Sequence, residues 1–439
     1  MATVKVYYFD AAGRAEIIRL VLAAAGIEFD DIRFPYLVSD DWATKYKPLA
    51  PFGQAPFVEY NGKRYGQSTA IAKFFAREND QHQFLCKSPG FYGANNLEAF
   101  RIDEVVGLVQ DLFTVTAKIY VEKDPVKKEE LRTAMVEGDG PKFFGFFEKL
   151  LQENGTGYFV GNQLSLADLM VYDMATQLRN TFNYDGLAHF PDIKALVEKV
   201  TSKDNIKKYI DSKKETKDHS CPASSASGAS TVAAQKAKMA NVKLFYFDSA
   251  GRAELIRLVL TAAKVEFDDV RFQGDDWPAK YKPVAPFGQA PFVEYNGKKY
   301  GQSIAIAKFF ARENGLYGAN NLEAFRIDEV VGLVQDFFTV LVKIFLEQDP
   351  AKKEEIKATM EKDDAPKFLR FFQKLLQENG TGYFVGDKLS LADLIVYDMV
   401  TQLQKTFNFD ASTDFPEIKA LVDKVASDEN IKTYIDSKK

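Results

Sequence analysis

The chain passes from a strand pattern into a helix pattern at VYYFDAAGRAE, residues 6–16, and again at LFYFDSAGRAE, residues 244–254. In both places an apolar run ends in tyrosine and phenylalanine, and a Gly-Arg pair opens a helical pattern. The tyrosine, Tyr8 or Tyr246, then lies beside the N-terminus of a helix, where an anion or a thiolate is favoured. The same phenol could equally fill the core, so its surroundings in the sequence decide its role.

The stretch occurs twice because nearly the whole chain is duplicated. Residues 51–63, PFGQAPFVEYNGK, recur verbatim from residue 286, and residues 92–111, YGANNLEAFRIDEVVGLVQD, recur verbatim from residue 317. A unit of about 200 residues is far longer than a solenoid repeat, so we interpret the chain as two copies of one protein. Residues 214–240 between the copies are rich in Ser, Ala and Lys and lack apolar periodicity, which is typical of a flexible linker.

The seam between the copies suggests how the duplication arose. The start of copy two, MANVK from residue 239, resembles the start of copy one, MATVK. A natural gene fusion and a read-through of two adjacent genes both fit this seam. Copy one also carries about ten extra residues near residues 80–89. We expect these residues, Cys86 among them, to form an inserted loop, because loops tolerate changes in length.

Each copy begins with alternating strands and helices and continues with helices alone. In copy one, helices are predicted after residues 13 and 68, and Asn61-Gly62 is typical of a type I′ hairpin turn. The predicted strands are residues 4–9, 29–34, 57–60 and 63–65. This βαβ-ββα order is that of a thioredoxin-like domain. Helical periodicity then covers residues 97–121, 127–151, 165–178, 193–200 and 206–210.

We therefore predict a composite of α+β and all-α domains, present as two tandem units. The Ser-Leu-Ala-Asp segments that begin at Ser165 and Ser390 have the spacing of a capping box, which marks the start of a helix. The predicted domains are 1–79 and 241–314 (thioredoxin-like), 80–91 (inserted loop), 92–213 and 315–439 (all-helical), and 214–240 (linker).

Composition and charge narrow the function. The 439 residues include 62 acidic and 57 basic side chains, and the net charge of −5 argues against nucleic acid and anionic membrane partners. No apolar run is long enough to span a bilayer. Cys86 and Cys221 form no disulfide framework, so a cytoplasmic location is expected. The histidines His82, His189 and His219 are scattered, so no metal site is expected.

Two turns in each copy could present backbone groups to a ligand. Pro56 follows Gln54 and Ala55 just before a strand, where a cis peptide bond would fix the backbone edge of Ala55. An ordinary loop proline is the alternative. Gln67-Ser68 joins a strand to a helix N-terminus, a place suited to a carboxylate or a phosphate. Its serine could instead serve only as the helix N-cap.

Side chains near Tyr8 leave similar alternatives. Arg14 could bind an anion or be a solvated charge at a helix end, and Trp42 could stack on a ligand or cover the core. The turn after the first strand often carries a nucleophilic cysteine in thioredoxin-like proteins, but here it has none, and copy two has no cysteine at all. Any thiol chemistry in copy two therefore needs a thiol from a bound molecule.

Together these motifs resemble those of the cytosolic glutathione transferases, and most closely the sigma class. The resemblance rests on the YFD…GRAE start, PFGQAP, GQS and the LSLAD segment, and it extends over nearly all of both copies. It implies that glutathione is the co-substrate and that Tyr8 and Tyr246 are catalytic, each hydrogen-bonding the glutathione sulfur. A free thiol has a pKa near 8.5, and a phenol that favours the thiolate by roughly 2–3 kcal/mol would lower this pKa by about two units.

The resemblance also implies the other residues of the site. Ala55 and Ala290 would offer backbone groups, and Asp111 and Asp336 would reach across the family's dimer. The glutathione-binding residues expected are Tyr8, Arg14, Trp42, Lys47, Gln54, Ala55, Pro56, Gln67, Ser68, Asp111, Tyr246, Arg252, Trp277, Lys282, Gln289, Ala290, Pro291, Gln302, Ser303 and Asp336. The residues expected around the electrophile, with core packing as the alternative for each, are Phe113, Ala117, Tyr120, Phe338, Val342 and Phe345.

The function implied is the conjugation of glutathione to hydrophobic electrophiles, as in detoxification. A prostaglandin D synthase-type isomerase is a second enzymatic interpretation, and a non-catalytic ligand-binding or crystallin-like structural protein is a third. The intact Tyr, Arg and Gln-Ser sets of both copies favour the enzyme. We also expect the two copies to pair, either within the chain as a pseudo-dimer or between chains.

Overall fold

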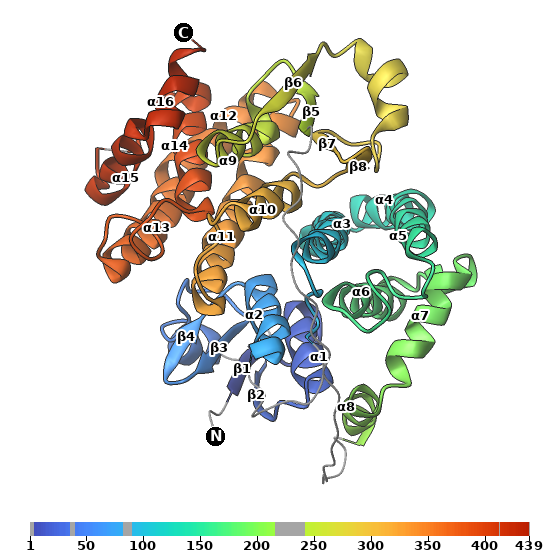
Figure 1. The fold of residues 1–439 in the computed structure, drawn as a ribbon. Coiled ribbons are helices and arrows are strands. Elements are labelled where there is room, and N and C mark those ends of the chain that lie inside the picture. Colours follow the sequence, from blue (N-terminus) through green and yellow to red (C-terminus); the bar gives the residue numbers. More distant parts are fainter. Residues whose placement is uncertain (1–3, 36–39, 82–89, 216–241, 412, 439) are drawn as a thin grey trace. The chain divides into compact units, whose positions relative to one another are not determined.

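The computed structural model describes residues 4–35, 40–81, 90–215, 242–411 and 413–438. These residues form two compact units, Met1–Lys238 and Met239–Lys439, and each unit holds one copy of the duplicated sequence (Figure 1). Several expectations fall outside the described residues, namely those for 216–240 of the linker, 82–89 of the insert, Cys86, Cys221, His82 and His219.

Each unit begins with a four-stranded mixed sheet, as predicted. In copy one the strand order is β2-β1-β3-β4, with β1 parallel to β2 and antiparallel to β3, and copy two repeats it as β6-β5-β7-β8. Asn61 and Gly62 have φ angles of 51° and 71°, the positive values that a type I′ turn requires. The strands are Val4–Phe9 (β1), Phe29–Phe34 (β2), Phe57–Tyr60 (β3), Lys63–Tyr65 (β4), Val242–Phe247 (β5), Phe267–Phe272 (β6), Phe292–Tyr295 (β7) and Lys298–Tyr300 (β8).

Two helices that contact each other complete this first domain. A 3-10 turn, Gly13–Ala15, precedes α1, and a π-helical turn, Trp42–Tyr46, follows β2. In copy one the second helix continues past the domain boundary predicted at residue 79. The helices are Glu16–Ala24 (α1), Ser68–Gln81 (α2), Glu254–Ala262 (α9) and Ser303–Glu313 (α10).

The rest of each copy is helical, but residues 127–151 do not form the single helix predicted. A π-helical segment, Met135–Asp139, separates α4 from α5, and Met360–Asp364 separates α12 from α13. The proline that follows, Pro141 or Pro366, lacks the amide that would continue the regular hydrogen bonds. The helices are Asn96–Val121 (α3), Pro125–Ala134 (α4), Gly140–Asn154 (α5), Leu166–Phe182 (α6), Pro191–Thr201 (α7), Asp204–Glu215 (α8), Asn321–Leu346 (α11), Pro350–Thr359 (α12), Ala365–Asn379 (α13), Leu391–Phe407 (α14), Pro416–Ser427 (α15) and Glu429–Asp436 (α16).

The predicted capping box is present at the start of α6 and of α14. The amide and hydroxyl of Ser165 donate to Asp168 Oδ2 at 2.7 and 2.6 Å, and the amide of Phe159 donates to Oδ1 at 2.9 Å. Ser390 and Asp393 make the same bonds in copy two. Burial raises the pKa of both aspartates to about 6, although these hydrogen bonds oppose the shift. The box fixes the start of a helix that packs against the first domain.

The last helix of each copy also returns to the first domain. Tyr434 on α16 donates its hydroxyl to Glu254 at 3.2 Å, and Lys438 forms an ion pair with the same carboxylate. The guanidinium of Arg257, whose side chain is fully buried, lies 3.3 Å from Glu254. The equivalent residues of copy one are Tyr209, Lys213, Glu16 and Arg19. Each copy is therefore closed by contacts between its two ends.

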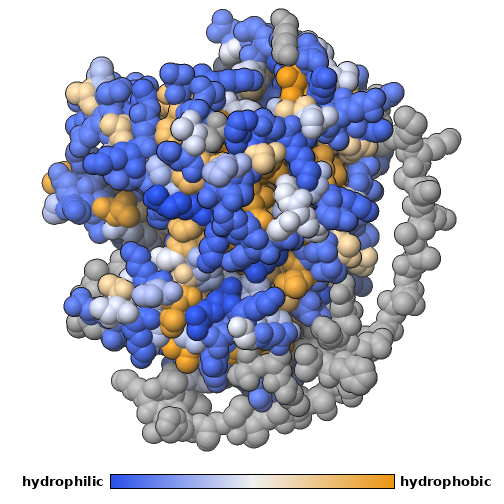
Figure 2. All heavy atoms as spheres, turned by 90° about the vertical axis from the view of Figure 1, so that its left-hand side faces the viewer, coloured by the Kyte–Doolittle hydropathy of each residue, from blue (hydrophilic) through white to orange (hydrophobic). Residues whose placement is uncertain are grey.

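The surface and the core separate in the usual way. On the face drawn in Figure 2, hydrophilic residues predominate, and hydrophobic residues form smaller patches between them. Large apolar side chains such as Phe57, Phe144 and Phe147 are fully buried. Of the helices that the structure describes, none has the length and apolar character needed to cross a membrane.

Candidate active site

In each copy the phenol at the end of the first strand lies against the turn that opens the first helix. The amide of Arg14 donates to the hydroxyl of Tyr8 at 3.3 Å, and the amide of Arg252 donates to Tyr246 at 3.2 Å. The phenol oxygen therefore accepts from one amide of the 3-10 turn that leads into the first helix, and amides at the start of a helix favour negative charge. Because this oxygen acts as an acceptor here, the O–H proton can be donated to a ligand.

The turn leaves no room for a side chain larger than hydrogen. Gly13 and Gly251 have φ angles of +45° and +43°, which glycine tolerates far better than other residues. A Cβ atom at Gly13 would lie 2.5 Å from the hydroxyl oxygen of Tyr8, and at Gly251 it would lie 2.6 Å from that of Tyr246. Glycine at this position is thus required both by the backbone and by the phenol that packs over it.

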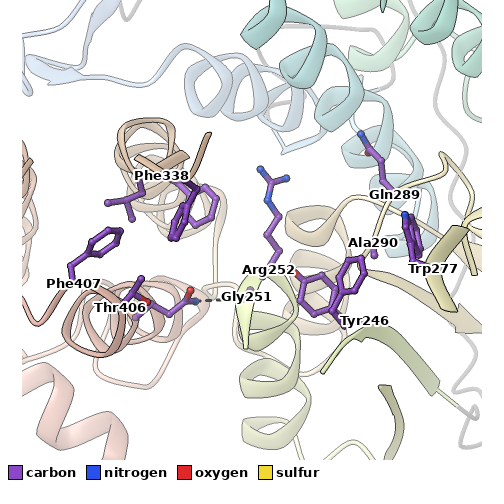
Figure 3. A pocket seen from close by; sticks show the side chains of 13 residues that line it. Tyr246, Gly251, Arg252, Trp277, Gln289, Ala290, Phe338, Thr406 and Phe407 are labelled. Carbon is purple, nitrogen blue, oxygen red and sulfur yellow. Dashed lines mark hydrogen bonds between the residues drawn. The ribbon is translucent and has the colours of Figure 1, made fainter. Parts of the chain in front are cut away.

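A glutamine from the helical domain donates a hydrogen bond to a backbone carbonyl of the same turn. Gln402 on α14 donates to the carbonyl of Gly251 at 3.5 Å, the bond that Figure 3 marks with a dashed line. Gln402 also donates to Asp398 Oδ1 at 2.8 Å. Burial raises the pKa of Asp398 to about 7, opposed by the bond from Gln402 and assisted by the charge of Glu254. In copy one, Gln177 likewise donates to the carbonyl of Gly13 at 3.1 Å and to Asp173 Oδ1 at 2.9 Å.

The predicted backbone site before the third strand has the expected cis peptide bond. Ala55-Pro56 and Ala290-Pro291 are both cis. The side chain of Lys47 packs against Gly53, and that of Lys282 packs against Gly288, so each lysine lies beside this turn. In each copy the alanine, the proline and the lysine predicted for the site are therefore close in space.

Gln67-Ser68 and Gln302-Ser303 stand at the helix N-terminus as predicted, but the serine is not the cap. Gln302 is the N-cap of α10, and Ser303 is the first helical residue. The φ angles of Gln67 and Gln302 are +63° and +61°, a strained conformation for a residue with a side chain. Strain of this kind is commonly retained where a ligand binds.

Each strained glutamine is linked to the glutamine before the cis peptide. Gln67 donates to Gln54 Oε1 at 3.3 Å, and Gln302 donates to Gln289 Oε1 at 3.5 Å. These bonds connect the two turns whose backbone groups were predicted to contact the ligand. The structure thus places the proline turn and the helix N-terminus next to each other in each copy.

The tryptophan and the arginine of the site each pack against aromatic rings. Trp42 stacks on Phe34 with ring centroids 5.6 Å apart and an interplanar angle of 10°, and the indole is half-buried. The guanidinium of Arg14 lies 4.7 Å from the ring of Phe113, and that of Arg252 lies 5.4 Å from the ring of Phe338. Such cation–π contacts connect the start of the first helix with the long helix α3 or α11.

In copy two, residues from the end of β5, the turns around Gly251 and Ala290, α11 and α14 surround a pocket of about 490 Å³, which thirteen residues line (Figure 3). Its polar side carries Tyr246, Arg252, Trp277, Gln289 and Ala290, all predicted glutathione contacts. On the opposite side of the view lie Phe338 and Phe407. The remaining lining residues are Phe247, Gly251, Leu341, Phe345, Gln402 and Thr406. A polar wall and an apolar wall therefore face one space.

Not every predicted residue lines this pocket. Phe338 and Phe345 of the expected electrophile site do, whereas Val342, which lies between them on the same helix, does not. Five predicted glutathione residues of copy two also lie outside the lining: Lys282, Pro291, Gln302, Ser303 and Asp336. Among the described residues, no three His, Cys, Asp or Glu side chains are grouped as metal ligands.

Sequence reasoning missed the contribution of α14. Gln402, Thr406 and Phe407 line the pocket although they lie over 150 residues after Tyr246 in the chain. The capping box predicted where this helix starts, but helical periodicity alone does not tell which of its turns reaches the first domain. The same limit applies to Leu341, which reads as an ordinary apolar residue of a long helix.

Family comparisons agree with this geometry. A model of the glutathione S-transferase N-terminal domain matches residues 4–77 and 241–312, and a model of the C-terminal domain matches residues 110–213 and 335–438. A glutathione S-transferase of Anopheles gambiae is 34% identical over 197 residues, which cover 96% of that protein and 45% of this chain. The chain belongs to the glutathione S-transferase family. It carries two complete copies of the family's two-domain unit, so the predicted enzyme class is confirmed.

Other relatives within this glutathione S-transferase family carry different names. The hematopoietic prostaglandin D synthase of Gallus gallus is 33% identical over 187 residues, 91% of that protein and 43% of this chain. S-crystallin SL11 of Nototodarus sloanii is 30% identical over 201 residues, 96% of that protein and 45% of this chain. Relatives of several kinds thus match one copy each, and they do not single out the sigma class.

Proposed function

We propose that both copies of this glutathione S-transferase bind glutathione, ionise its thiol with Tyr8 or Tyr246, and conjugate it to hydrophobic electrophiles. The observation that carries the proposal is the placement of Tyr246. Its hydroxyl accepts a hydrogen bond from the amide of Arg252, at the turn that leads into the helix. Tyr246 also lines a pocket that has one polar and one apolar wall. A sulfur held there would be within reach of the phenol proton and of a substrate on the apolar side.

Ionisation is the step that the phenol would assist. A thiol with a pKa near 8.5 is mostly protonated at neutral pH, and the thiolate is the nucleophile. A hydrogen bond donated by the Tyr246 hydroxyl to the sulfur favours the thiolate, and the amide of Arg252 supports it by donating to the phenol oxygen. With a nitroaryl chloride, the sulfur attacks the carbon that bears chlorine, a C–S bond forms, the C–Cl bond breaks and chloride leaves. The thiol proton passes to solvent.

The polar wall has the groups needed to hold a peptide. Arg252 and Trp277 would contact the glycyl and backbone parts of glutathione, and the main chain of Ala290 would pair with the cysteinyl part. Gln302-Ser303 at the start of α10 would bind the γ-glutamyl carboxylate, because a helix N-terminus favours an anion. Lys282 and Asp336 complete the predicted set.

We infer the same roles for copy one, where each of these residues has an identical counterpart. The roles fall to Tyr8, Arg14, Trp42, Lys47, Gln54, Ala55, Pro56, Gln67, Ser68 and Asp111. Placement in the sigma class, a cytoplasmic location and a part in detoxification are further inferences from the sequence motifs and the acidic, cysteine-poor composition.

Pairing of the two copies is a separate part of this proposal. The predicted linker has about 27 residues, and an unstructured chain of that length would span roughly 30 Å on average, so the sequence allows the copies of one chain to pair. Asp336 would then serve the site of Tyr8, and Asp111 that of Tyr246. A monomeric mass in solution together with two glutathione sites per chain is the expected result, and a stable dimer of chains would contradict it.

The phenol role has a direct test. The Tyr8→Phe/Tyr246→Phe variant should lose most conjugation of glutathione to a nitroaryl chloride while it still binds a glutathione-affinity matrix. The matched control is Tyr7→Phe, because copy two carries Phe245 at this position and a tyrosine is not needed there. Full turnover by the double variant would refute the role of the phenols. Loss of matrix binding would instead show that they act in binding rather than in ionisation.

A further inference from the structure

The residues that line the pocket of copy two and their counterparts in copy one differ on one wall only. Of the thirteen residues that line the pocket of copy two, eleven are identical at the equivalent positions of copy one. The two exceptions are Leu341, where copy one has Thr116, and Phe345, where copy one has Tyr120. Both lie on the long helix, α11 or α3, and both add a hydroxyl in copy one. The polar wall is unchanged.

The difference is concentrated where the long helix passes the pocket. Residues 92–111 and 317–336 are identical. In the ten residues that follow, LFTVTAKIYV (112–121) against FFTVLVKIFL (337–346), five positions differ. The two copies are therefore identical in the first part of the long helix and differ in its second part, which contributes Leu341 and Phe345 to the apolar wall.

Tyr120 and Phe345 occupy the same place in their copies. The ring of Tyr120 contacts Phe182 with centroids 5.4 Å apart, and the ring of Phe345 contacts Phe407 with centroids 5.7 Å apart. The two side chains are also equally exposed, at 53% and 52%. The exchange therefore places a phenol hydroxyl at the rim of one site, where the other has only a ring edge.

The second difference, Thr116 in copy one against Leu341 in copy two, changes the size of the side chain next to that rim. Both are buried, at 3% and 5% exposure. The hydroxyl of Thr116 donates to the carbonyl of Phe113 at 2.9 Å, so it is satisfied within its own helix. Threonine has one side-chain heavy atom fewer than leucine, so copy one gains space here, whereas Leu341 fills the pocket of copy two with apolar surface.

We propose that the two sites of one chain select different electrophiles. The site of copy two takes compact and wholly apolar substrates. The site of copy one takes substrates that carry a hydrogen-bonding group at the end away from the reacting carbon, with Tyr120 as the partner of that group. This assignment rests on the proposed function, because it concerns the substrate of the same conjugation reaction.

A matched pair of electrophiles tests the assignment: phenethyl isothiocyanate and its para-hydroxy derivative. In both, the sulfur forms a bond to the isothiocyanate carbon, the C=N π bond opens, and the thiol proton ends on nitrogen, with no leaving group. The Tyr246→Phe chain reports site one, and the Tyr8→Phe chain reports site two. The ratio of kcat/KM for the hydroxylated compound to that for the plain one should be about fivefold higher at site one, the usual effect of one hydrogen bond.

Exchange of the two wall residues should exchange the preference. In the Tyr8→Phe chain, Leu341→Thr/Phe345→Tyr should raise the ratio about fivefold, and Thr116→Leu/Tyr120→Phe should lower it in the Tyr246→Phe chain. The control is Leu346→Val, which also imports a copy-one residue but lies outside the pocket lining and should leave the ratio unchanged.

The outcomes separate this inference from the function beneath it. Equal ratios at the two sites, or ratios that the exchange does not move, would overturn the assignment while conjugation itself remained. If the exchanged variants bind the glutathione matrix and conjugate the plain compound, a failed exchange cannot be ascribed to misfolding. An unsubstituted chain that conjugates neither isothiocyanate would refute the proposed function and the assignment together.

Discussion

Replacement of Gly251 by alanine is expected to displace the phenol of Tyr246, the proposed catalytic group of copy two, without removing any functional group. The added Cβ would lie 2.6 Å from the hydroxyl oxygen of Tyr246, whereas ordinary contacts of a Cβ begin near 3.4 Å. The oxygen must therefore move by about 0.8 Å. The backbone contributes as well, because φ at this position is +43° and a left-handed conformation costs alanine about 1–2 kcal/mol.

The displacement can be converted into a rate. A misplacement of 1 Å in a catalytic group can cost on the order of 10²-fold. For Gly251→Ala we therefore expect kcat/KM to fall about 10- to 100-fold, equivalent to roughly 1.4–2.7 kcal/mol of transition-state stabilisation. The measurement is conjugation of glutathione to a nitroaryl chloride in a chain that also carries Tyr8→Phe, so that only copy two contributes.

Gly297→Ala provides a matched control for backbone strain. Gly297 has φ of +73°, and a Cβ atom there would meet no atom within 4 Å. It should lower the melting temperature much as Gly251→Ala does but leave kcat/KM within about twofold, since it does not touch the phenol. Unchanged turnover in Gly251→Ala would refute the reasoning, as would an equal loss of turnover in both variants.

Three further predictions concern Gln402, Asp398 and Asp328. Gln402→Leu should lower kcat of copy two several-fold with little change in melting temperature, because it releases the Gly251 carbonyl; steady-state kinetics in the Tyr8→Phe chain measures this. Burial raises the pKa of Asp398 to about 7, so the folded state retains a proton that the unfolded state loses, and stability should fall as pH rises from about 4 to 7. Thermal melts should show that Asp398→Asn reduces this fall. Asp328→Ala should lower the free energy of unfolding by about 3–5 kcal/mol, because Lys308 stays buried but loses the carboxylate that now lies 2.5 Å from its ammonium and also accepts from Tyr317. Urea denaturation at neutral pH measures this loss.

Short-range patterns were sufficient to predict most of the fold. The strands of the first domain, the type I′ turn at Asn61-Gly62 and the capping box at Ser165 all follow from residues that are neighbours in the sequence. The break between α4 and α5 was missed, because helical periodicity continues through residues 135–139 while the backbone hydrogen bonds do not. A single proline had more effect on the backbone than the apolar pattern around it indicated.

The candidate site also has a part that the sequence could indicate and a part that it could not. The residues of the polar wall were named through the resemblance to the glutathione transferases, because the motifs that carry this resemblance lie at strand ends, turns and helix starts. The contribution of α14 was not predicted, since Gln402 and Gly251 are 151 residues apart and meet only when the two domains pack. Nor does any local signal predict the positive φ of Gln302, which is imposed by the junction between β8 and α10. The sequence thus named five residues of one wall and Phe338 and Phe345 of the other, but none of the residues that α14 contributes.

The closure of each copy by its own last helix has a consequence for synthesis on the ribosome. Glu16 cannot meet Tyr209 and Lys213 until the end of α8 has been translated, so the first helix of copy one waits for the last. Copy one then completes its contacts before the equivalent segments of copy two exist. This order protects a chain with verbatim repeats, in which identical segments could otherwise exchange places and misassemble.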